Sequence, residues 1–175
     1  MALETNRLRL IPCTLDLLEA EGADRARFAE LLGAKVPQEW PPELYDDDAR
    51  RWTIDKLKAG PRFDGWLVWY AVVRETSALV GLAGYKGPPD EQGVVEVGYG
   101  ILPPHRRNGY ASEATAALIA RAFALPEVTA VAAETYPHLT ASLGVMRENG
   151  MTYVGPGSED GVVRYQVSRP NPQRH

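Results

Sequence analysis

Apolar residues recur along this chain with two different periods. Between residues 5 and 11, Leu8 and Leu10 alternate with Arg7 and Arg9, which is typical of a strand with one buried face. Short runs rich in β-branched and aromatic residues predict further strands at 65–74, 79–85, 94–102, 129–135, 153–154 and 162–167. Helical spacing predicts one helix capped by Thr14 or Asp16 and others at 24–32, 46–58, 112–125 and 140–149.

The order of these elements predicts an α/β fold with a mixed sheet. Three consecutive strands between residues 65 and 102 are joined by short turns and should form an antiparallel meander. The helix at 112–125 then connects two strands, and such a crossover implies parallel pairing with a right-handed connection. We therefore expect a mostly antiparallel mixed sheet with helices on its faces. For 175 residues we assign a single domain at 1–168 and a frayed tail at 169–175.

A basic loop joins the last strand of that meander to the alanine-rich helix. A strand that delivers a loop onto a helix N-terminus presents unpaired N–H groups and the positive end of a helix dipole, which attract anions. Arg106 and Arg107 add two cations, and Gly109 lets the backbone approach a ligand closely. The chain has neither G-x-G-x-x-G nor G-x-x-x-x-G-K-[ST], which argues against a dinucleotide fold or a P-loop. The residues alone leave two readings, a pyrophosphate site or a solvated basic turn.

Composition narrows the classes of function. The chain is 45% hydrophobic and 24% charged, as ordinary globular proteins are, and its net charge of −4 argues against nucleic acid as a partner. Cys13 is the only cysteine, so we expect a packing role for it, and three scattered histidines predict no metal site. The chain shows no basic-then-apolar leader and no apolar run long enough to span a membrane, so we expect a cytoplasmic protein without a membrane partner.

Four motifs, in family order, resemble those of the GNAT acyl-CoA N-acyltransferases. The loop motif Arg106-x-x-Gly109-x-Ala111 fits the R/Q-x-x-G-x-G/A signature of that family. The flanking motifs resemble the branch that contains the Rim-type ribosomal-protein N-terminal acetyltransferases: E-T-x-R-L-x-L at 4–10, E-x-G-Y-x-x-x-P at 96–103 and G-Y-A-x-E-A at 109–114. The resemblance covers residues 4 to 168 and implies the GNAT fold, acetyl-CoA as co-substrate and an amine as acceptor.

The resemblance also implies where the substrates lie. In GNAT folds the two parallel strands splay apart and the acyl-CoA lies between them, so the backbone N–H groups of Ile101 and Leu102 would hold the pantetheine arm. The pyrophosphate would bind the loop formed by Arg106, Arg107, Asn108, Gly109, Tyr110 and Ala111. Trp40 and Tyr45 would lie near the acceptor amine. The alternative for Trp40 is that it anchors its loop to the core.

Acyl transfer to an amine needs a base, because an alkylamine has a pKa of about 10.4 and is protonated at neutral pH. Glu96 lies mid-strand between valines, where partial burial would make its carboxylate a stronger base. We interpret Glu96 as the general base, acting through a water molecule, and Glu134 as the second candidate. The alternative is that Glu96 pairs with a cation or faces solvent.

The leaving thiolate needs a proton donor. Many GNAT enzymes place a tyrosine on the penultimate helix, where this chain has Met146. The Rim-type branch shows N-x-x-S instead, and the resemblance implies that Ser142 is the serine that contacts or protonates the thiol. Leu139 replaces the family asparagine, and His138 or Thr140 could supply a substitute hydrogen bond. His138 could also serve as acid or base. The alternatives are a packing role for Ser142 and a structural one for His138.

Together these features predict an N-acetyltransferase that moves an acetyl group from acetyl-CoA to a primary amine by direct attack in a ternary complex. The acceptor could be a protein N-terminal amine, a free amino acid, a polyamine or an amine antibiotic, and the protein a monomer or a homodimer. The alternative is a GNAT-like module that binds acyl-CoA without turnover, as a sensor or interaction domain. Glu96 favours the enzyme, whereas Leu139 and Met146, which replace the family asparagine and tyrosine, keep the non-catalytic module as an alternative.

Overall fold

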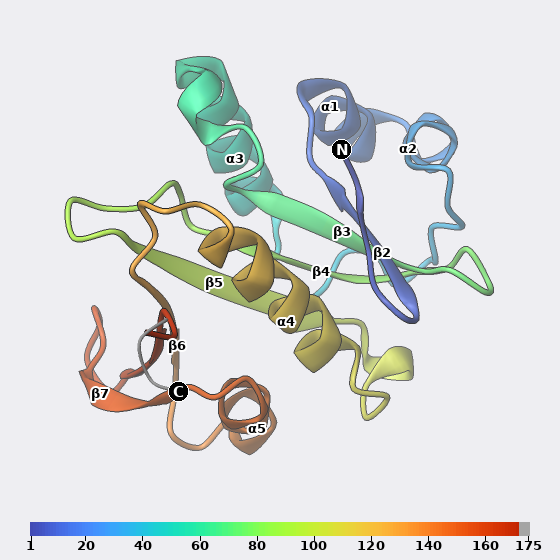
Figure 1. The fold of residues 1–175 in the computed structure, drawn as a ribbon. Coiled ribbons are helices and arrows are strands. Elements are labelled where there is room, and N and C mark those ends of the chain that lie inside the picture. The colour runs from blue at the N-terminus through green and yellow to red at the C-terminus, as the bar shows by residue number, and fades with distance from the viewer. Residues whose placement is uncertain (172–175) are drawn as a thin grey trace.

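Eight strands form one sheet in the computed structural model of the protein, which describes residues 1–171 (Figure 1). The strands are β1 (Leu3–Glu4), β2 (Leu8–Pro12), β3 (Val68–Val73), β4 (Leu79–Tyr85), β5 (Val94–Ile101), β6 (Ala130–Thr135), β7 (Thr152–Pro156) and β8 (Val163–Ser168). The helices are α1 (Leu15–Ala23), α2 (Arg25–Leu32), α3 (Asp47–Ala59), α4 (Tyr110–Phe123) and α5 (Thr140–Glu148), with 3-10 turns at Pro61–Phe63 and Pro103–His105. Within residues 1–171, no helix is long and apolar enough to cross a membrane.

The strand order is β1-β2-β3-β4-β5-β6-β8-β7. The first five strands pair antiparallel, each beside its neighbour in sequence. β5 and β6 pair in parallel, with α4 as the crossover between them, and β8 lies antiparallel between β6 and the edge strand β7. This mixed sheet with helices on its faces confirms the predicted fold class.

Alternate side chains of the sheet enter two separate hydrophobic cores. On β3, Trp69 belongs to one core, whereas Tyr70 and Val72 belong to the other. The first core lies under α4, which contributes Leu118 and crosses the front of the sheet in Figure 1. The second core lies under α1 and α2, which contribute residues such as Phe28. Because each strand has a period of two, neighbouring residues of β5 are likewise presented to opposite faces of the sheet.

Local sequence decides where the helices begin. Thr14, Asp24 and Asp46 each accept a hydrogen bond from the N–H three residues further on, and these caps start α1, α2 and α3. The helix predicted from Ser112 begins earlier, at Tyr110. The reason is Gly109, whose φ of 78° turns the chain directly from the loop into the helix.

Arg169, where we expected a frayed tail to begin, is fixed against the end of α4. Its backbone N–H donates to the Thr129 carbonyl at 2.8 Å, and its guanidinium donates to the carbonyls of Phe123, Leu125 and Val128. The bonds to Phe123 and Leu125 supply donors to carbonyls that a helix C-terminus leaves unpaired. The last part of the predicted tail, at 172–175, lies outside the described residues.

Candidate active site

β5 and β6 are paired for only three residues. The pairing runs from Val94 opposite Ala130 to Glu96 opposite Ala132, although β5 continues to Ile101 and β6 to Thr135. Beyond Glu96 the two strands no longer hydrogen-bond to each other, and we call these unpaired stretches, 97–101 and 133–135, the fork. One edge of β5 is therefore open to a ligand along the fork.

Backbone N–H groups along β5 alternate between β4 and the fork. Leu102, just after β5, donates its N–H to the Val80 carbonyl at 2.8 Å. Since these directions alternate along a strand, the N–H groups of Tyr99 and Ile101 point to the fork. The N–H of Ile101 is therefore available along the fork, whereas the N–H of Leu102 is used within the sheet. The motif at 96–103 contains Tyr99 but does not indicate that its N–H faces the fork, because only the register of β5 against β4 reveals this.

The residues predicted to hold the pyrophosphate form one turn before α4. Arg107 and Gly109 both have left-handed backbones, with φ of 64° and 78°. Asn108 donates from Nδ2 to the His105 carbonyl at 2.9 Å, so its side chain closes the turn. Among the described residues no side chain caps α4, which leaves the N–H groups of its first turn open to an anion.

The two arginines of this turn differ in their surroundings. Arg106 donates from Nε to the Ile101 carbonyl at 2.9 Å, so its guanidinium lies at the end of β5, and its Nη2 lies 3.8 Å from Glu43 Oε1. Arg107 is exposed. Both arginines thus belong to the loop that leads into α4, and the Arg106 side chain also links this loop to the segment between α2 and α3.

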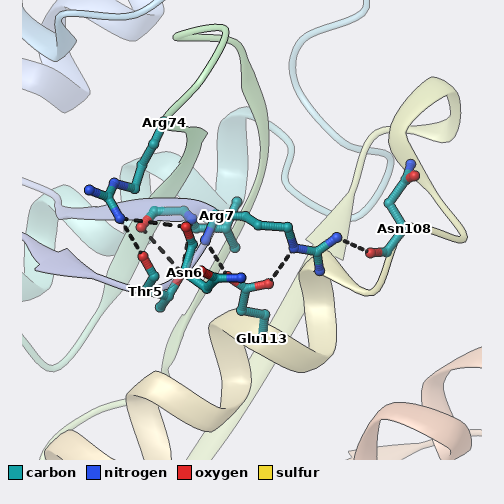
Figure 2. A network of polar contacts seen from close by, with 7 residues as sticks. Thr5, Asn6, Arg7, Arg74, Asn108 and Glu113 are labelled. Atoms are coloured by element: carbon teal, nitrogen blue, oxygen red, sulfur yellow. Dashed lines mark hydrogen bonds and ion pairs between the residues drawn. The ribbon is translucent and has the colours of Figure 1, made fainter.

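An unpredicted network holds the loop at 106–109 from the N-terminal side (Figure 2). Arg7 donates from its backbone N–H to Glu113 Oε1 at 2.8 Å, from Nε to Glu113 Oε2 at 2.7 Å and from Nη1 to the Asn108 carbonyl at 2.6 Å. Its guanidinium lies 4.7 Å from the centre of the Tyr110 ring. Thr5 Oγ1 adds a third donor to the carboxylate at 2.6 Å. The sequence contained the motifs of both partners but no signal that they meet.

Glu113 is held as a carboxylate by this network. Burial by itself raises the pKa of Glu113, but the hydrogen bonds from Thr5 and Arg7 outweigh it and leave the pKa below its usual range. The negative charge in the first turn of α4 is therefore matched by the Arg7 guanidinium. An anion at the open N-terminus of α4 would otherwise face an unneutralised carboxylate.

Glu96 lies where the fork begins, between two cations. Lys86 Nζ is 2.6 Å from Glu96 Oε1, and Arg164 Nη1 is 3.5 Å from Oε2. The pairing with a cation that the sequence left open is thus what the structure contains. The Glu96 side chain is 21% exposed, although its Oε1 is itself buried. The two cations hold the carboxylate in place at the start of the fork.

Glu134, the second candidate base, is bonded more completely. Arg164 Nη1 lies 3.1 Å from its Oε1, and Ser158 donates from its backbone N–H and, at 2.7 Å, from Oγ. Burial raises the pKa of Glu134, but the bonds from Ser158 and Arg164 outweigh it and lower the pKa overall. Its oxygens are engaged in closing the β7–β8 turn, which favours a structural role.

Ser142, in the first turn of α5, is bonded to Tyr99 of β5. The Tyr99 hydroxyl donates to the Ser142 carbonyl at 2.9 Å and lies 3.1 Å from Ser142 Oγ. Burial raises the pKa of Tyr99 above its usual value, and the bond with Ser142 offsets this only in part. The phenol is thus protonated at neutral pH. Tyr99 and Glu96 lie on opposite faces of β5, so the two groups flank the fork.

The positions around Ser142 differ in what they can contribute. Met146 is fully buried, so it belongs to the core. Leu139 is 41% exposed, and the ring of the exposed His138 stacks on Tyr136 with centroids 5.7 Å apart. Thr140 is exposed at the start of α5. The structure therefore brings Ser142, not His138, into contact with a residue of β5.

Trp40 and Tyr45 are core residues in the segment between α2 and α3. Trp40 donates from Nε1 to Glu21 Oε1 at 2.7 Å, and Tyr45 and Tyr70 donate to Glu21 Oε2 at 3.1 and 2.7 Å. Burial raises the pKa of Glu21, and the bonds from the three aromatic residues lower it only in part. A cavity of about 90 Å³ borders this cluster. The anchoring role that the sequence left open for Trp40 is the one these contacts support.

The same segment reaches the fork with other residues. The Pro42 side chain lies against β5, with its Cβ 3.6 Å from the position of a Cβ on Gly100. Leu44 is 92% exposed beside it in sequence. Pro42 gave no motif signal, because its position against β5 depends on where the Trp40 and Tyr45 anchors hold the segment. In the part of the chain that the structure describes, no cluster of His, Cys, Asp and Glu side chains is arranged to hold a metal ion.

Comparison with known proteins adds independent findings. A family model described as an acetyltransferase (GNAT) domain matches residues 14–152. The chain is 33% identical over 133 residues to a protein of Bacillus subtilis (strain 168) named uncharacterized N-acetyltransferase YjdG. The aligned region covers 75% of this chain and 77% of that relative.

Solved structures of low identity share the fold. The ribosomal-protein-S5-alanine acetyltransferase from Vibrio fischeri superimposes with a TM-score of 0.68 at 12% identity, over 99% of this chain and all of that one. RimL, a ribosomal L7/L12 alpha-N-protein acetyltransferase solved with coenzyme A, gives a TM-score of 0.67 at 15% identity, over 96% of this chain and 98% of that one.

Proposed function

Because the chain belongs to the GNAT family of acetyl-CoA-dependent N-acetyltransferases, we propose that it transfers an acetyl group to a primary amine by direct attack in a ternary complex. The observation that carries this mechanism is the fork and the groups on either side of it. Glu96 stands on one face of β5, and the Tyr99–Ser142 pair on the other. A thioester lying in the fork would have a base on the side of the incoming amine and hydrogen-bond donors on the other side.

The chain offers acetyl-CoA a continuous set of donors. The N–H groups of Tyr99 and Ile101 would bind the pantetheine arm as a further strand, and one of them could donate to the carbonyl oxygen as negative charge develops on it. The open first turn of α4, with Arg106 and Arg107, would bind the pyrophosphate. The absence of a Cβ at Gly109 lets phosphate oxygens approach the backbone.

Glu96 would remove a proton from the acceptor ammonium, directly or through a water molecule. Of the two candidate carboxylates, Glu96 is the one at the start of the fork, and within residues 1–171 its carboxylate is paired with Lys86 and Arg164, whereas Glu134 also accepts bonds from Ser158. Lys86 and Arg164 fix the carboxylate in position. The neutral amine then attacks the carbonyl carbon and expels the thiolate.

Ser142 would donate a hydrogen bond to the leaving thiolate, with Tyr99 positioning it. The raised pKa of Tyr99 makes its phenolate a stronger base than a thiolate, whose acid has a pKa of about 8.5. Tyr99 therefore serves as a hydrogen-bond donor and not as the source of a lost proton. The proton for the sulfur comes from the attacking nitrogen.

A second candidate function is an acyl-CoA-binding module without turnover. The pairing of Glu96 with two cations favours it, because each carboxylate oxygen already has a cation beside it before an acceptor amine arrives. The acceptor of the enzyme, in contrast, would be a protein N-terminal amine or a small-molecule amine. The Vibrio fischeri protein and RimL are named for protein substrates, which supports including N-terminal peptides in a screen.

One sample tests both functions. Acetyl-CoA and CoA are titrated into the purified protein by calorimetry, and thiol release is then followed with a panel of amines and N-terminal peptides. We expect binding and turnover, with Glu96→Gln lowering kcat roughly 10²–10⁴-fold while the Kd for acetyl-CoA stays within about twofold. Binding without turnover on any acceptor would support the module, and no binding would overturn the coenzyme site.

A further inference from the structure

The Lys86 ammonium occupies the position beside the Glu96 carboxylate that an acceptor amine would need. It follows β4 directly, and its N–H donates to the Glu96 carbonyl at 2.9 Å, so the two residues are opposite each other and their side chains share a face. Nζ lies 2.6 Å from Glu96 Oε1, a distance at which a base can take a proton. The contact that would activate an acceptor ammonium is thus already made by a primary amine of the chain itself.

The Lys86 side chain also has the freedom to move. It is 61% exposed, and among the described residues its only ion pair is the one with Glu96. Neighbouring strands lie about 4.8 Å apart, so Nζ has to cross roughly one strand to pass from the β4 side of Glu96 to the fork on its other side. The flexible four-carbon stem can cover this distance without a change in the backbone.

We propose that Lys86 is a self-acetylation site, an inference that rests on the proposed function with Glu96 as base. Glu96 takes one proton from the Lys86 ammonium, and the neutral Nζ attacks the carbonyl carbon of acetyl-CoA. The new N–C bond forms, the C–S bond breaks, and the thiolate takes the second proton from nitrogen. The products are N-acetyl-lysine and the free thiol of CoA, and the proton on Glu96 passes to solvent.

The modification would change the charge balance at Glu96. Acetylation removes the positive charge of Lys86 and ends its ion pair with the carboxylate. Arg164, at 3.5 Å, would then be the remaining cation beside Glu96 among the described residues. An external amine would then approach a Glu96 carboxylate that is no longer paired with Lys86.

The chain supplies its own internal standard. Its other lysines, Lys35, Lys56 and Lys58, lie after α2 and on α3, and none of them makes an ion pair within residues 1–171. Acetyl-CoA reacts slowly with any accessible lysine, so the exposed Lys35 and Lys58 and the half-buried Lys56 report the uncatalysed background. Because Lys86 is held beside a base, its acetylation should exceed that background by roughly tenfold or more.

The experiment incubates the full chain with acetyl-CoA and no acceptor, and follows the acetyl occupancy of each lysine by peptide mass spectrometry. We expect Lys86 to be modified first, at a rate per molecule that does not depend on protein concentration. Glu96→Gln should reduce Lys86 to the background of the other lysines, and Lys86→Arg, which keeps the positive charge, should remove the fast phase. Circular dichroism and acetyl-CoA titration check that both variants are folded.

The outcomes separate this inference from the function on which it rests. If Lys86 reacts no faster than the other three lysines, or equally fast in Glu96→Gln, self-acetylation at Lys86 is overturned. If an added amine is acetylated while Lys86 stays unmodified, the proposed function stands without it. If the protein neither binds acetyl-CoA nor releases thiol, both are overturned together.

Discussion

Arg7 and Glu113, which are 106 residues apart in the chain, form two hydrogen bonds, from the Arg7 backbone N–H and from its Nε, that join the β1–β2 turn to the first turn of α4 (Figure 2). The same guanidinium bonds the carbonyl of Asn108 in the loop before α4. A residue of the turn between β1 and β2 therefore holds the loop that we propose as the pyrophosphate site, although it lies outside the loop motif. This relationship leads to the first prediction.

Arg7→Met should weaken acetyl-CoA binding roughly tenfold, because it releases the Asn108 carbonyl and leaves the charge of Glu113 unmatched near the pyrophosphate. The substrate S-acetyl-pantetheine lacks the pyrophosphate, so its KM should not change. Calorimetry and thiol-release kinetics measure the two effects. Arg74→Met is the matched control, since Arg74 bonds the Thr5 carbonyl in the same turn but does not contact the loop. Equal losses with both coenzymes would show that Arg7 acts on the fold in general.

Tyr99→Phe should lower kcat by roughly three- to tenfold, because the Ser142 hydroxyl loses the partner that orients it. Ser142→Ala should lower kcat at least as much. If Tyr99 acts through Ser142, adding Tyr99→Phe to Ser142→Ala should cause no further loss, and the double-mutant cycle measures this coupling. Fully additive effects would contradict a shared role.

Glu134→Gln should lower the free energy of unfolding at neutral pH by about 1–3 kcal/mol, because Arg164 and Ser158 lose a charged acceptor. The pKa of Glu134 is lowered by folding, so its contribution is complete above the unfolded value of about 4.3 and is lost as pH falls through the folded value. The variant should therefore lose less stability than the wild type below about pH 4.3, as urea titrations at several pH values would show. Folding also lowers the pKa of Glu113, but this residue is present in both proteins, so its contribution cancels in the comparison. If the free energies of unfolding of the variant and the wild type fell in parallel as the pH is lowered, this role of Glu134 would be refuted.

Trp40→Phe should cost about 1–3 kcal/mol of stability, because it removes the Nε1 donor and leaves Glu21 Oε1 without that bond in the core. The phenyl ring keeps most of the packing, so the fold should survive. Thermal unfolding gives the stability. If Trp40 is an anchor, the KM for the acceptor should stay within about twofold of the wild type at a temperature where both proteins are folded. A large rise in that KM with little loss of stability would instead place Trp40 at the acceptor.

Local patterns were sufficient for much of this structure. The alternation of Leu8 and Leu10 with arginines, the capping residues before α1, α2 and α3, and the strand–loop–helix unit around Gly109 are all short-range properties. They depend on periodicity and on backbone preferences that act within a few residues. The mixed sheet followed from the order of these elements, because connection rules leave few topologies for it.

Contacts between distant residues were decided by the tertiary structure. The sequence alone placed Glu96 on a strand and left open whether it would meet a cation, and the register of β4, β6 and β8 brought Lys86 and Arg164 to it. Likewise, the bond of Leu102 to Val80 and that of Tyr99 to Ser142 depend on which strand or helix lies alongside β5. A side chain's neighbours across a sheet are set by packing over the whole domain, and no local pattern in the chain encodes them.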